Sequence, residues 1–303
     1  MTVALAPAGA RRRVLAYLEL TKPRISLLVM VTAVPALLLA GGGVSDPLRF
    51  WGTLVGTVLA AGSAASFNHY VDRDIDALMR RTRTRPLPAG VLPPRDALVV
   101  GFTLAALAWA VLSACANGLA AAIAMASIVY YAVVYSMWLK RRTPQNIVIG
   151  GGAGASAPLI AWAAMTGRVE LTAVLLAAIV FLWTPPHFWA LALYRRDDYL
   201  RANLPMLPVT HGEAETRRQI LLYSLVLVPV TLAVAPLGGV GPLYWLPAAI
   251  MGGLFIYFAF ILWRSAETAH AVRLFRYSIL YLFLVFAFMA ADAAVQSLHR
   301  ASH

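Results

Sequence analysis

The most regular feature of the chain is a series of long apolar runs separated by short polar segments. Nine such runs lie near 25–42, 51–69, 97–115, 118–138, 146–165, 171–194, 219–237, 243–263 and 275–297. Each has the about 17–25 residues that an α-helix needs to cross a bilayer. The gap at Ala116–Asn117 is short, so eight or ten spans also fit the pattern. The pattern therefore predicts an all-α polytopic membrane protein with nine transmembrane helices.

Composition excludes the soluble and disordered classes. Of the 303 residues, 61% are hydrophobic and 13% are charged, and the mean hydropathy is +0.74. A soluble domain is roughly half apolar and about a quarter charged, and a disordered chain is poor in aliphatic and aromatic residues. The net charge of +12 sits between apolar runs rather than on one soluble face, so we expect no nucleic-acid partner. The single cysteine, Cys115, excludes an intramolecular disulfide and a cysteine-based metal cluster.

The basic residues divide unevenly between the two sides of the predicted bundle. Only Arg49, Arg168 and Arg300 fall on one side, and the other 22 of the 25 Lys and Arg fall in the N-terminal segment and in alternate loops. The positive-inside rule places the side with most of the Lys and Arg residues, together with the N-terminus, in the cytoplasm. The first apolar run lacks a cleavage site and the N-terminal segment is not Ser-rich, so we expect a retained first helix in a bacterial inner membrane. We expect one domain over 1–303, with cytoplasmic segments at 1–20, 69–96 and 195–218.

Carboxylates concentrate directly after the second apolar run. Asn68, Asp72 and Asp76 are spaced by four residues, so they share one face if the helix continues, while Asp74 points to nearly the opposite side. Oxygen ligands of this kind suit Mg²⁺, which typically takes one or two carboxylates together with substrate phosphates. The alternative is a solvated helix end with incidental charges.

A second acidic pair, Asp197 and Asp198, follows the sixth run. Four runs separate it from the first cluster, so both clusters are expected on the same side of the membrane. Thr143 lies 122 residues after Thr21 at the start of a run, and Asp198 lies 122 residues after Asp76. This common offset predicts an internal four-helix duplication, which would put two acidic sites on opposite walls of one cavity.

A basic run at 80–85 lies a few residues beyond the first acidic cluster. Arginine side chains match phosphate oxygens with two parallel hydrogen bonds. The alternative is a topological signal or attraction to anionic lipids, worth about 1 kcal/mol per cation. Carboxylates for Mg²⁺ beside arginines for an anion outline a diphosphate site.

Specific motifs resemble those of a known family. Asn68-x-x-x-Asp72-x-x-x-Asp76, followed by Arg81-Thr-Arg-Thr-Arg85-Pro-Leu, resembles the first signature of the UbiA superfamily of intramembrane prenyltransferases. Three further segments resemble the protoheme IX farnesyltransferases, or heme O synthases, within that superfamily: Lys140 to Gly151, Thr184-Pro-Pro-His-Phe-Trp189 and Asp198 to Val209. The resemblance runs from about Thr21 to the last apolar run. It implies a UbiA-type helical bundle.

The resemblance also implies a reaction and a set of residues. The reaction transfers the farnesyl group of farnesyl diphosphate to a vinyl group of heme b, with addition of water, and gives heme O and diphosphate. Membrane lipids surround the enzyme, and heme A synthase or terminal oxidase assembly factors are candidate partners. The implied Mg²⁺ ligands, which are also the catalytic set, are Asn68, Asp72, Asp76 and Asp198. The implied substrate-binding residues are Arg81, Arg85, Lys140, Asn146, His187 and Tyr194.

Two alternatives to this reading stay open at this point. A superfamily member with another aromatic or tetrapyrrole acceptor would carry the same acidic motif. A heme or lipid transporter would also be a duplicated helical bundle, although transporters usually place coupling charges near the middle of the bilayer. The role of Asp197 is open, because relatives can carry lysine at its position.

One ionisable residue of the motifs, His187, lies inside a predicted membrane span. It follows Pro185 and Pro186 inside the sixth run and precedes Asp198 by 11 residues. Ionisable residues inside a membrane are rare and by default indicate function. The prolines free backbone carbonyls, so we expect a kink that opens a deep cavity. A neutral imidazole there could ligate heme iron, hydrogen-bond a propionate, or simply satisfy a freed carbonyl.

Overall fold

The computed structural model describes residues 9–41 and 43–301, and within them all regular secondary structure is helical. The helices are α1 (Ala10–Leu20), α2 (Pro23–Gly41), α3 (Pro47–Leu78), α4 (Pro94–Cys115), α5 (Gly118–Val129), η1 (Tyr130–Leu139), α6 (Asn146–Gly154), α7 (Ser156–Thr166), α8 (Leu171–Tyr194), α9 (Arg196–Arg201), α10 (Leu207–Thr210), α11 (Gly212–Gly238), α12 (Pro242–Arg264) and α13 (Thr268–Ala301).

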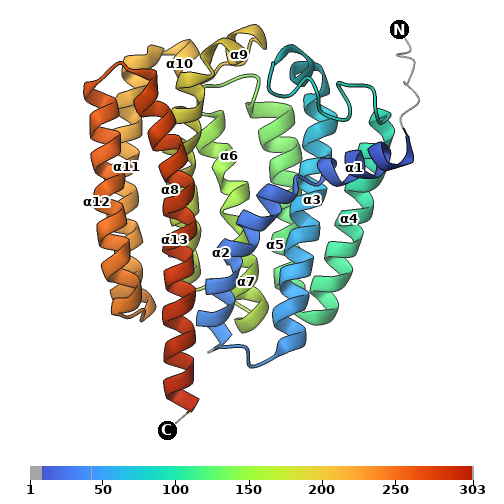
Figure 1. The fold of residues 1–303 in the computed structure, drawn as a ribbon. Helices are drawn as coiled ribbons and strands as arrows, with labels where there is room; N and C mark the ends of the chain where they lie inside the picture. Colours follow the sequence, from blue (N-terminus) through green and yellow to red (C-terminus); the bar gives the residue numbers. More distant parts are fainter. Residues whose placement is uncertain (1–8, 42, 302–303) are drawn as a thin grey trace.

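Nine helical segments of the described chain are long and apolar enough to cross a membrane. Three of the nine are built from two consecutive helices: α1 with α2, α5 with η1, and α6 with α7. Figure 1 places α1 near one end of the bundle and the end of α13 at the other, as an odd number of crossings requires. The prediction of a nine-helix, multi-pass membrane protein is confirmed.

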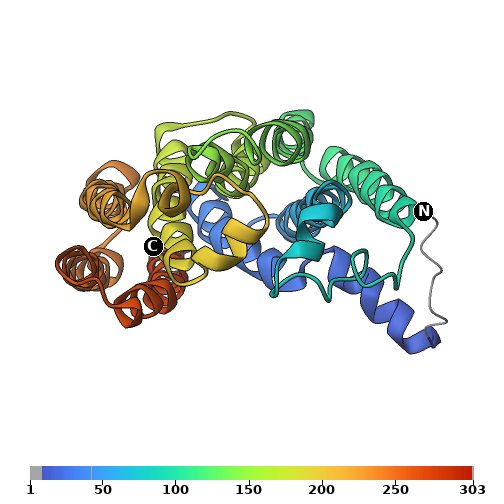
Figure 2. The same ribbon diagram turned by 90° about the horizontal axis from the view of Figure 1, so that it is seen from above.

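The helices form two packed groups that share a central layer. Seen from above, α11, α12 and α13 lie on one side and α3, α4 and α5 on the other, with α2, α7 and α8 between them (Figure 2). The larger apolar core joins α8 to α11–α13, and a second core joins α3–α5 to α7. Of the central helices, α7 contributes to both cores.

Several helical ends differ from the predicted boundaries in a way that matters for the site. The helix α3 continues to Leu78, and α11 already begins at Gly212. The expected loops at 69–96 and 195–218 are consequently shorter, because apolar runs mark only the lipid-facing part of a helix. Part of the expected N-terminal segment 1–20 forms α1, and residues 1–8 lie outside the described chain.

The two prolines of α8 do not interrupt it. Pro185 and Pro186 lie inside α8, buried among neighbouring helices, and the helix runs without a break from Leu171 to Tyr194. The helix therefore passes through the proline pair without ending there. A proline removes one hydrogen-bond donor and crowds the preceding turn, and dense packing around α8 retains the helix in spite of that cost.

A π-helix forms the last part of the fourth span. Residues 130–139 form η1, in which each turn is wider than in an α-helix, and Lys140 follows directly. Single π-turns occur frequently at functional sites because they change where side chains point. The small residues of α6 pack tightly against this element: a Cβ atom on Gly150 would lie 2.3 Å from Tyr135 Cδ2. Packing therefore accounts for this glycine.

Asp292 of α13 has the structural partner that its membrane position requires. Its Oδ2 atom accepts hydrogen bonds from the backbone N–H of Gly241 and from Gln296 Nε2, both at 2.7 Å. Gly241 directly precedes α12, whose N-terminus carries partial positive charge. Asp292 therefore fixes the start of α12 against α13, and it has no part in the acidic site.

Candidate active site

A small apolar cluster brings the two acidic segments together. Ile75 and Met79 at the end of α3 pack with Tyr199 of α9 and with the segment that follows it. The backbone N–H of Arg80 then donates to Asp198 Oδ1 at 3.2 Å. The end of α3 and the helices α9 and α10 lie at the same end of the bundle (Figure 1). The structure thus places both acidic clusters at one end, as the even number of intervening spans predicts.

The helical-face prediction for the first cluster is confirmed. Asn68, Asp72 and Asp76 are buried, with exposed fractions of 3%, 0% and 2%, while the Asp74 side chain keeps 60% of its surface. Asp74 instead pairs at the surface with Arg141, whose guanidinium donates at 2.6 and 2.7 Å. This carboxylate raises the pKa of Arg141. An exposed pair of this kind contributes about 0–1 kcal/mol.

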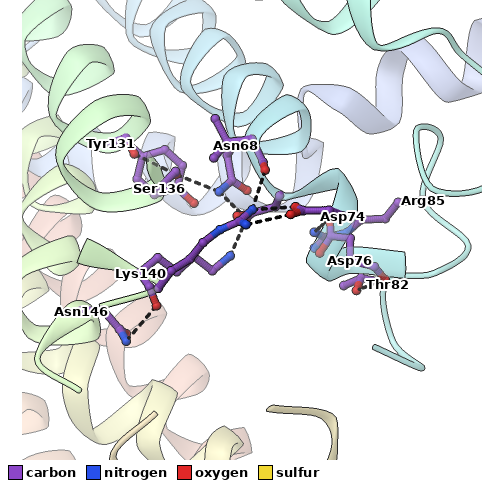
Figure 3. Close-up of polar contacts among 12 residues, drawn as sticks. Asn68, Asp74, Asp76, Thr82, Arg85, Tyr131, Ser136, Lys140 and Asn146 are labelled. Atoms are coloured by element: carbon purple, nitrogen blue, oxygen red, sulfur yellow. Dashed lines mark hydrogen bonds and ion pairs between the residues drawn. The ribbon is translucent and has the colours of Figure 1, made fainter. Parts of the chain in front are cut away.

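The upper part of the buried face is a network around Asp72. Asn68 Nδ2 donates to Asp72 Oδ2 at 2.7 Å and to Ser136 Oγ at 2.9 Å (Figure 3). Lys140 forms an ion pair with the same Asp72 oxygen. Lys22 Nζ donates to Asn68 Oδ1 at 2.6 Å. The π-helix η1 places Ser136 and Lys140 toward α3, so three separate spans meet at this network.

The second part of the face centres on Asp76 and Asp198. Arg85 Nη1 donates to Asp76 Oδ2 at 2.7 Å, and Thr82 Oγ1 donates to the Asp76 backbone oxygen at 2.9 Å (Figure 3). Asp198 is paired with Arg201 on α9. Burial raises the pKa of Tyr199, whose ring packs beneath this region. Each of the three buried carboxylates therefore carries a cationic partner.

Lys22 is a site residue that the sequence pattern did not reveal, because it counted only as a topological cation. It lies between α1 and α2 with φ of +48°, a left-handed conformation that is uncommon for a residue with a side chain. Such a conformation costs on the order of 1–3 kcal/mol and is often retained at functional sites. Pro23 fixes the start of α2 immediately afterwards. The junction turns the chain and lets Lys22 reach Asn68.

Three further predicted site residues are Asn146, Arg81 and Tyr194. Asn146 is buried, and its Nδ2 atom donates to the backbone oxygens of Thr143 at 2.6 Å and Lys140 at 3.4 Å, so it holds the segment that carries Lys140. Arg81 is exposed and pairs with none of the described carboxylates. Tyr194 contacts the Phe275 ring edge-on at 5.7 Å.

The buried carboxylates can bind a hard divalent cation, and the basic side chains beside them can bind an anionic ligand. The side-chain ligands are oxygens, and Asp72 Oδ1 is enclosed with no hydrogen-bond partner. No three carboxylate, imidazole or thiol groups converge on one point in the described chain. In this structure Asp72, Asp76 and Asp198 each pair with a cation of their own, and their assignment with Asn68 as metal ligands stays a prediction. Mg²⁺ commonly takes one or two carboxylates with phosphate and water, which these residues can supply.

Comparison with known proteins agrees with this geometry. Residues 29–290 match the UbiA prenyltransferase family. The chain is 48% identical over 290 residues to a protoheme IX farnesyltransferase of Parvibaculum lavamentivorans, covering 94% of this chain and 91% of the relative. It is also 48% identical over 293 residues to the protein of that name from Azotobacter vinelandii, covering 96% of this chain and 98% of the relative.

Solved structures share the fold at low sequence identity. A structure described for digeranylgeranylglyceryl phosphate synthase superposes with a TM-score of 0.78 at 19% identity, covering 94% of this chain and 99% of that one. A UbiA homologue from Archaeoglobus fulgidus, bound to DMAPP and Mg²⁺, superposes with a TM-score of 0.60 at 17% identity, covering 90% and 98%. These comparisons, with the acidic face of α3, show that the chain belongs to the UbiA prenyltransferase family.

Proposed function

We propose that this protein transfers the farnesyl group of farnesyl diphosphate to a vinyl group of heme b and adds water, giving heme O and diphosphate. The observation that carries the proposal is the buried set of three carboxylates and their cations at one end of an apolar bundle. The full-length similarity to proteins named protoheme IX farnesyltransferase supports farnesyl as donor group and heme as acceptor. Enzyme and substrates meet within the membrane, because both the prenyl chain and the porphyrin are apolar.

The chemistry needs strong charge stabilisation at the leaving group. The C1–O bond of farnesyl diphosphate breaks as C1 becomes an allylic cation, and both electrons leave with diphosphate. The C1–vinyl carbon bond forms, and water then adds to the other vinyl carbon and releases a proton. Lys22, Arg85 and Lys140 contact Asn68, Asp76 and Asp72, which supports a role for them in binding the diphosphate oxygens. Fixed positive groups aimed at developing negative charge are usually a large part of catalysis.

Asp72, Asp76 and Asp198, with Asn68, are the residues that would hold Mg²⁺. The cation, when bound, supplies Lewis-acid stabilisation of the departing diphosphate. In this structure each carboxylate pairs with Lys140, Arg85 or Arg201. We infer that those basic side chains turn to phosphate oxygens on substrate binding, since the same exchange leaves every buried charge paired.

The orientation in the membrane follows from the distribution of basic residues. We propose that the end carrying the acidic face lies in the cytoplasm of a bacterial inner membrane, because 22 of the 25 Lys and Arg belong to that side of the predicted topology. Farnesyl diphosphate is charged and water-soluble at one end, so an active site at this end receives it from the cytosol. Heme A synthase and oxidase assembly factors remain candidate partners on the product side.

Purified protein with heme b, farnesyl diphosphate and Mg²⁺ should give a product heavier than heme b by one farnesyl group plus one water. Mass spectrometry of the extracted porphyrin measures this directly, and EDTA should stop the reaction. Hydroxybenzoate offered in place of heme b is the specificity control. Prenylation of hydroxybenzoate with no change to heme b would discard the heme assignment and retain only the family.

Asp72→Asn and Asp76→Asn should each lower kcat by about 10²–10³-fold, because each removes a buried charge next to the leaving group. Asp74→Asn is the matched control: it makes the same change on the same helix but on the exposed face, and it should retain activity within about twofold. Size-exclusion chromatography checks that all three variants insert and fold. Equal sensitivity of Asp74 and Asp72 would contradict the assignment of the buried face.

Lys22→Met should raise KM for farnesyl diphosphate about tenfold, since charge-assisted hydrogen bonds contribute about 1.5–3 kcal/mol. Steady-state kinetics with heme b held saturating measures the effect. Arg24→Met is the control, because Arg24 is two residues away, exposed and outside the network around Asp72. An unchanged KM in Lys22→Met would remove Lys22 from the diphosphate site.

The topology is open to a labelling test. In a Cys115→Ser background, cysteines at Asp74 and at Arg201 should react with a membrane-impermeant maleimide only when the cytoplasmic face is accessible. A cysteine at Arg168, exposed at the opposite end, should react only from outside. The reverse labelling pattern would invert the proposed orientation.

A further inference from the structure

His187 of α8 lies in an aromatic stack away from the acidic face. Its ring is parallel to Trp183 on one side, with centroids 4.3 Å apart, and to Phe275 of α13 at 4.7 Å. Phe188 meets it edge-on at 5.1 Å. Tyr194 ends α8 seven residues later, so His187 lies about 10 Å deeper than that end. The two stacked rings fix the plane of the imidazole and leave only its edge for interactions.

Hydrogen bonds to Ser278 determine which ring nitrogen carries the proton. His187 Nδ1 lies 2.7 Å from Ser278 Oγ, and the same Oγ lies 2.7 Å from the Phe275 backbone oxygen. A carbonyl oxygen only accepts, so the single hydroxyl proton of Ser278 goes to Phe275. Ser278 Oγ can then only accept from His187, which places a proton on Nδ1. An imidazole buried among aromatic rings without a carboxylate partner is neutral, so Nε2 carries a lone pair.

The Nε2 atom is not fully enclosed. It has no hydrogen-bond partner in the described chain, yet it keeps some accessible surface, unlike both ring nitrogens of His69. His187 as a whole keeps 8% of its surface exposed. The structure therefore presents a fixed lone pair at membrane depth, on a residue that the mechanism at the acidic face does not use.

We propose that His187 Nε2 is the axial ligand of the heme iron of the acceptor, and that Ser278 is the positioning residue that fixes the ligating tautomer. The proposal rests on heme b as the acceptor in the proposed function. An unprotonated nitrogen attracts a Lewis acid and repels a carboxylate, so of the polar parts of heme b it fits the iron and not a propionate. This geometry decides between the two heme-binding roles among the three that the sequence left open for His187.

Ser278 is anchored for this role from two directions. Its backbone oxygen accepts a 2.7 Å hydrogen bond from Trp183 Nε1, while its hydroxyl accepts from His187 one helical turn further along α8. Metal-bound histidines almost always donate their other N–H to such a fixed acceptor, and its loss typically weakens metal affinity about 10–100-fold. The arrangement thus has the second partner that an iron ligand requires.

The test compares heme b with iron-free protoporphyrin IX, because only heme b offers an axial coordination position. Purified protein should bind heme b with the absorption spectrum of a histidine-ligated iron. His187→Ala should weaken heme b binding at least about tenfold and leave protoporphyrin IX binding within about twofold. Added imidazole should restore the spectrum. Equal weakening for both porphyrins, or an unchanged heme spectrum, would overturn the proposal.

Two further variants decide the matter even if His187→Ala fails to fold. His187→Cys should replace the imidazole signature with that of a thiolate-ligated iron. Ser278→Ala should lower the iron–histidine stretching frequency in resonance Raman spectra, and Ser278→Thr, which keeps the hydroxyl, should retain it. A purely structural role for Ser278 would change thermal stability and leave this frequency unmoved, which would contradict the positioning role.

These measurements need no farnesyl diphosphate and no turnover, so they separate the two proposals. Histidine ligation without product formation would support the iron site and refute the proposed reaction. Heme O formation with an unchanged heme spectrum in His187→Ala would support the reaction and refute the iron site.

Discussion

The constraint on which the site depends is that three carboxylates are buried at the edge of an apolar bundle. An isolated buried charge costs several kcal/mol, so each must have a partner of opposite charge. The partners come from separate elements: Lys140 follows the π-helix, Arg85 lies in the segment after α3, and Arg201 belongs to α9. The helices at this end are consequently held together by charge as well as by the small apolar cluster beneath it. A bound Mg²⁺–diphosphate unit carries both signs and can exchange with these pairs without leaving a charge unpaired.

Much of this arrangement could be predicted because it depends on local periodicity. The four-residue spacing of Asn68, Asp72 and Asp76 specifies a shared helical face without any tertiary information, and the buried face and exposed Asp74 follow from it. The nine spans follow from bilayer thickness alone. The same-end position of Asp198 follows from counting crossings, since any even number returns the chain to its starting side.

What could not be predicted depends on contacts between distant spans or on local backbone exceptions. Lys22 reaches Asn68 only because its own backbone is left-handed, and no periodic pattern announces such a residue. Ser136 and Lys140 are aimed by a π-helix, whose register differs from the one that an α-helical count assumes. The cation that pairs with each carboxylate could not be predicted for a related reason: periodicity identifies the face of a helix, but side-chain rotamers and neighbouring cations decide where each carboxylate points.

The acidic face and the proposed heme-binding residue, His187, depend on the fold in different ways. The acidic face requires only one helix face and nearby cations, and its motif is the one by which the chain resembles the UbiA superfamily as a whole. The His187 arrangement requires a particular meeting of α8 with α13, in which Trp183 and His187 both bind Ser278. It lies in the Thr184–Trp189 region, where the resemblance to the heme farnesyltransferases is most specific. We infer that donor chemistry can be shared across this fold, while the packing around His187 bears on the choice of acceptor. A porphyrin held through its iron also leaves the vinyl edge free, since coordination at the centre of the ring places no demand on the periphery where the new bond forms.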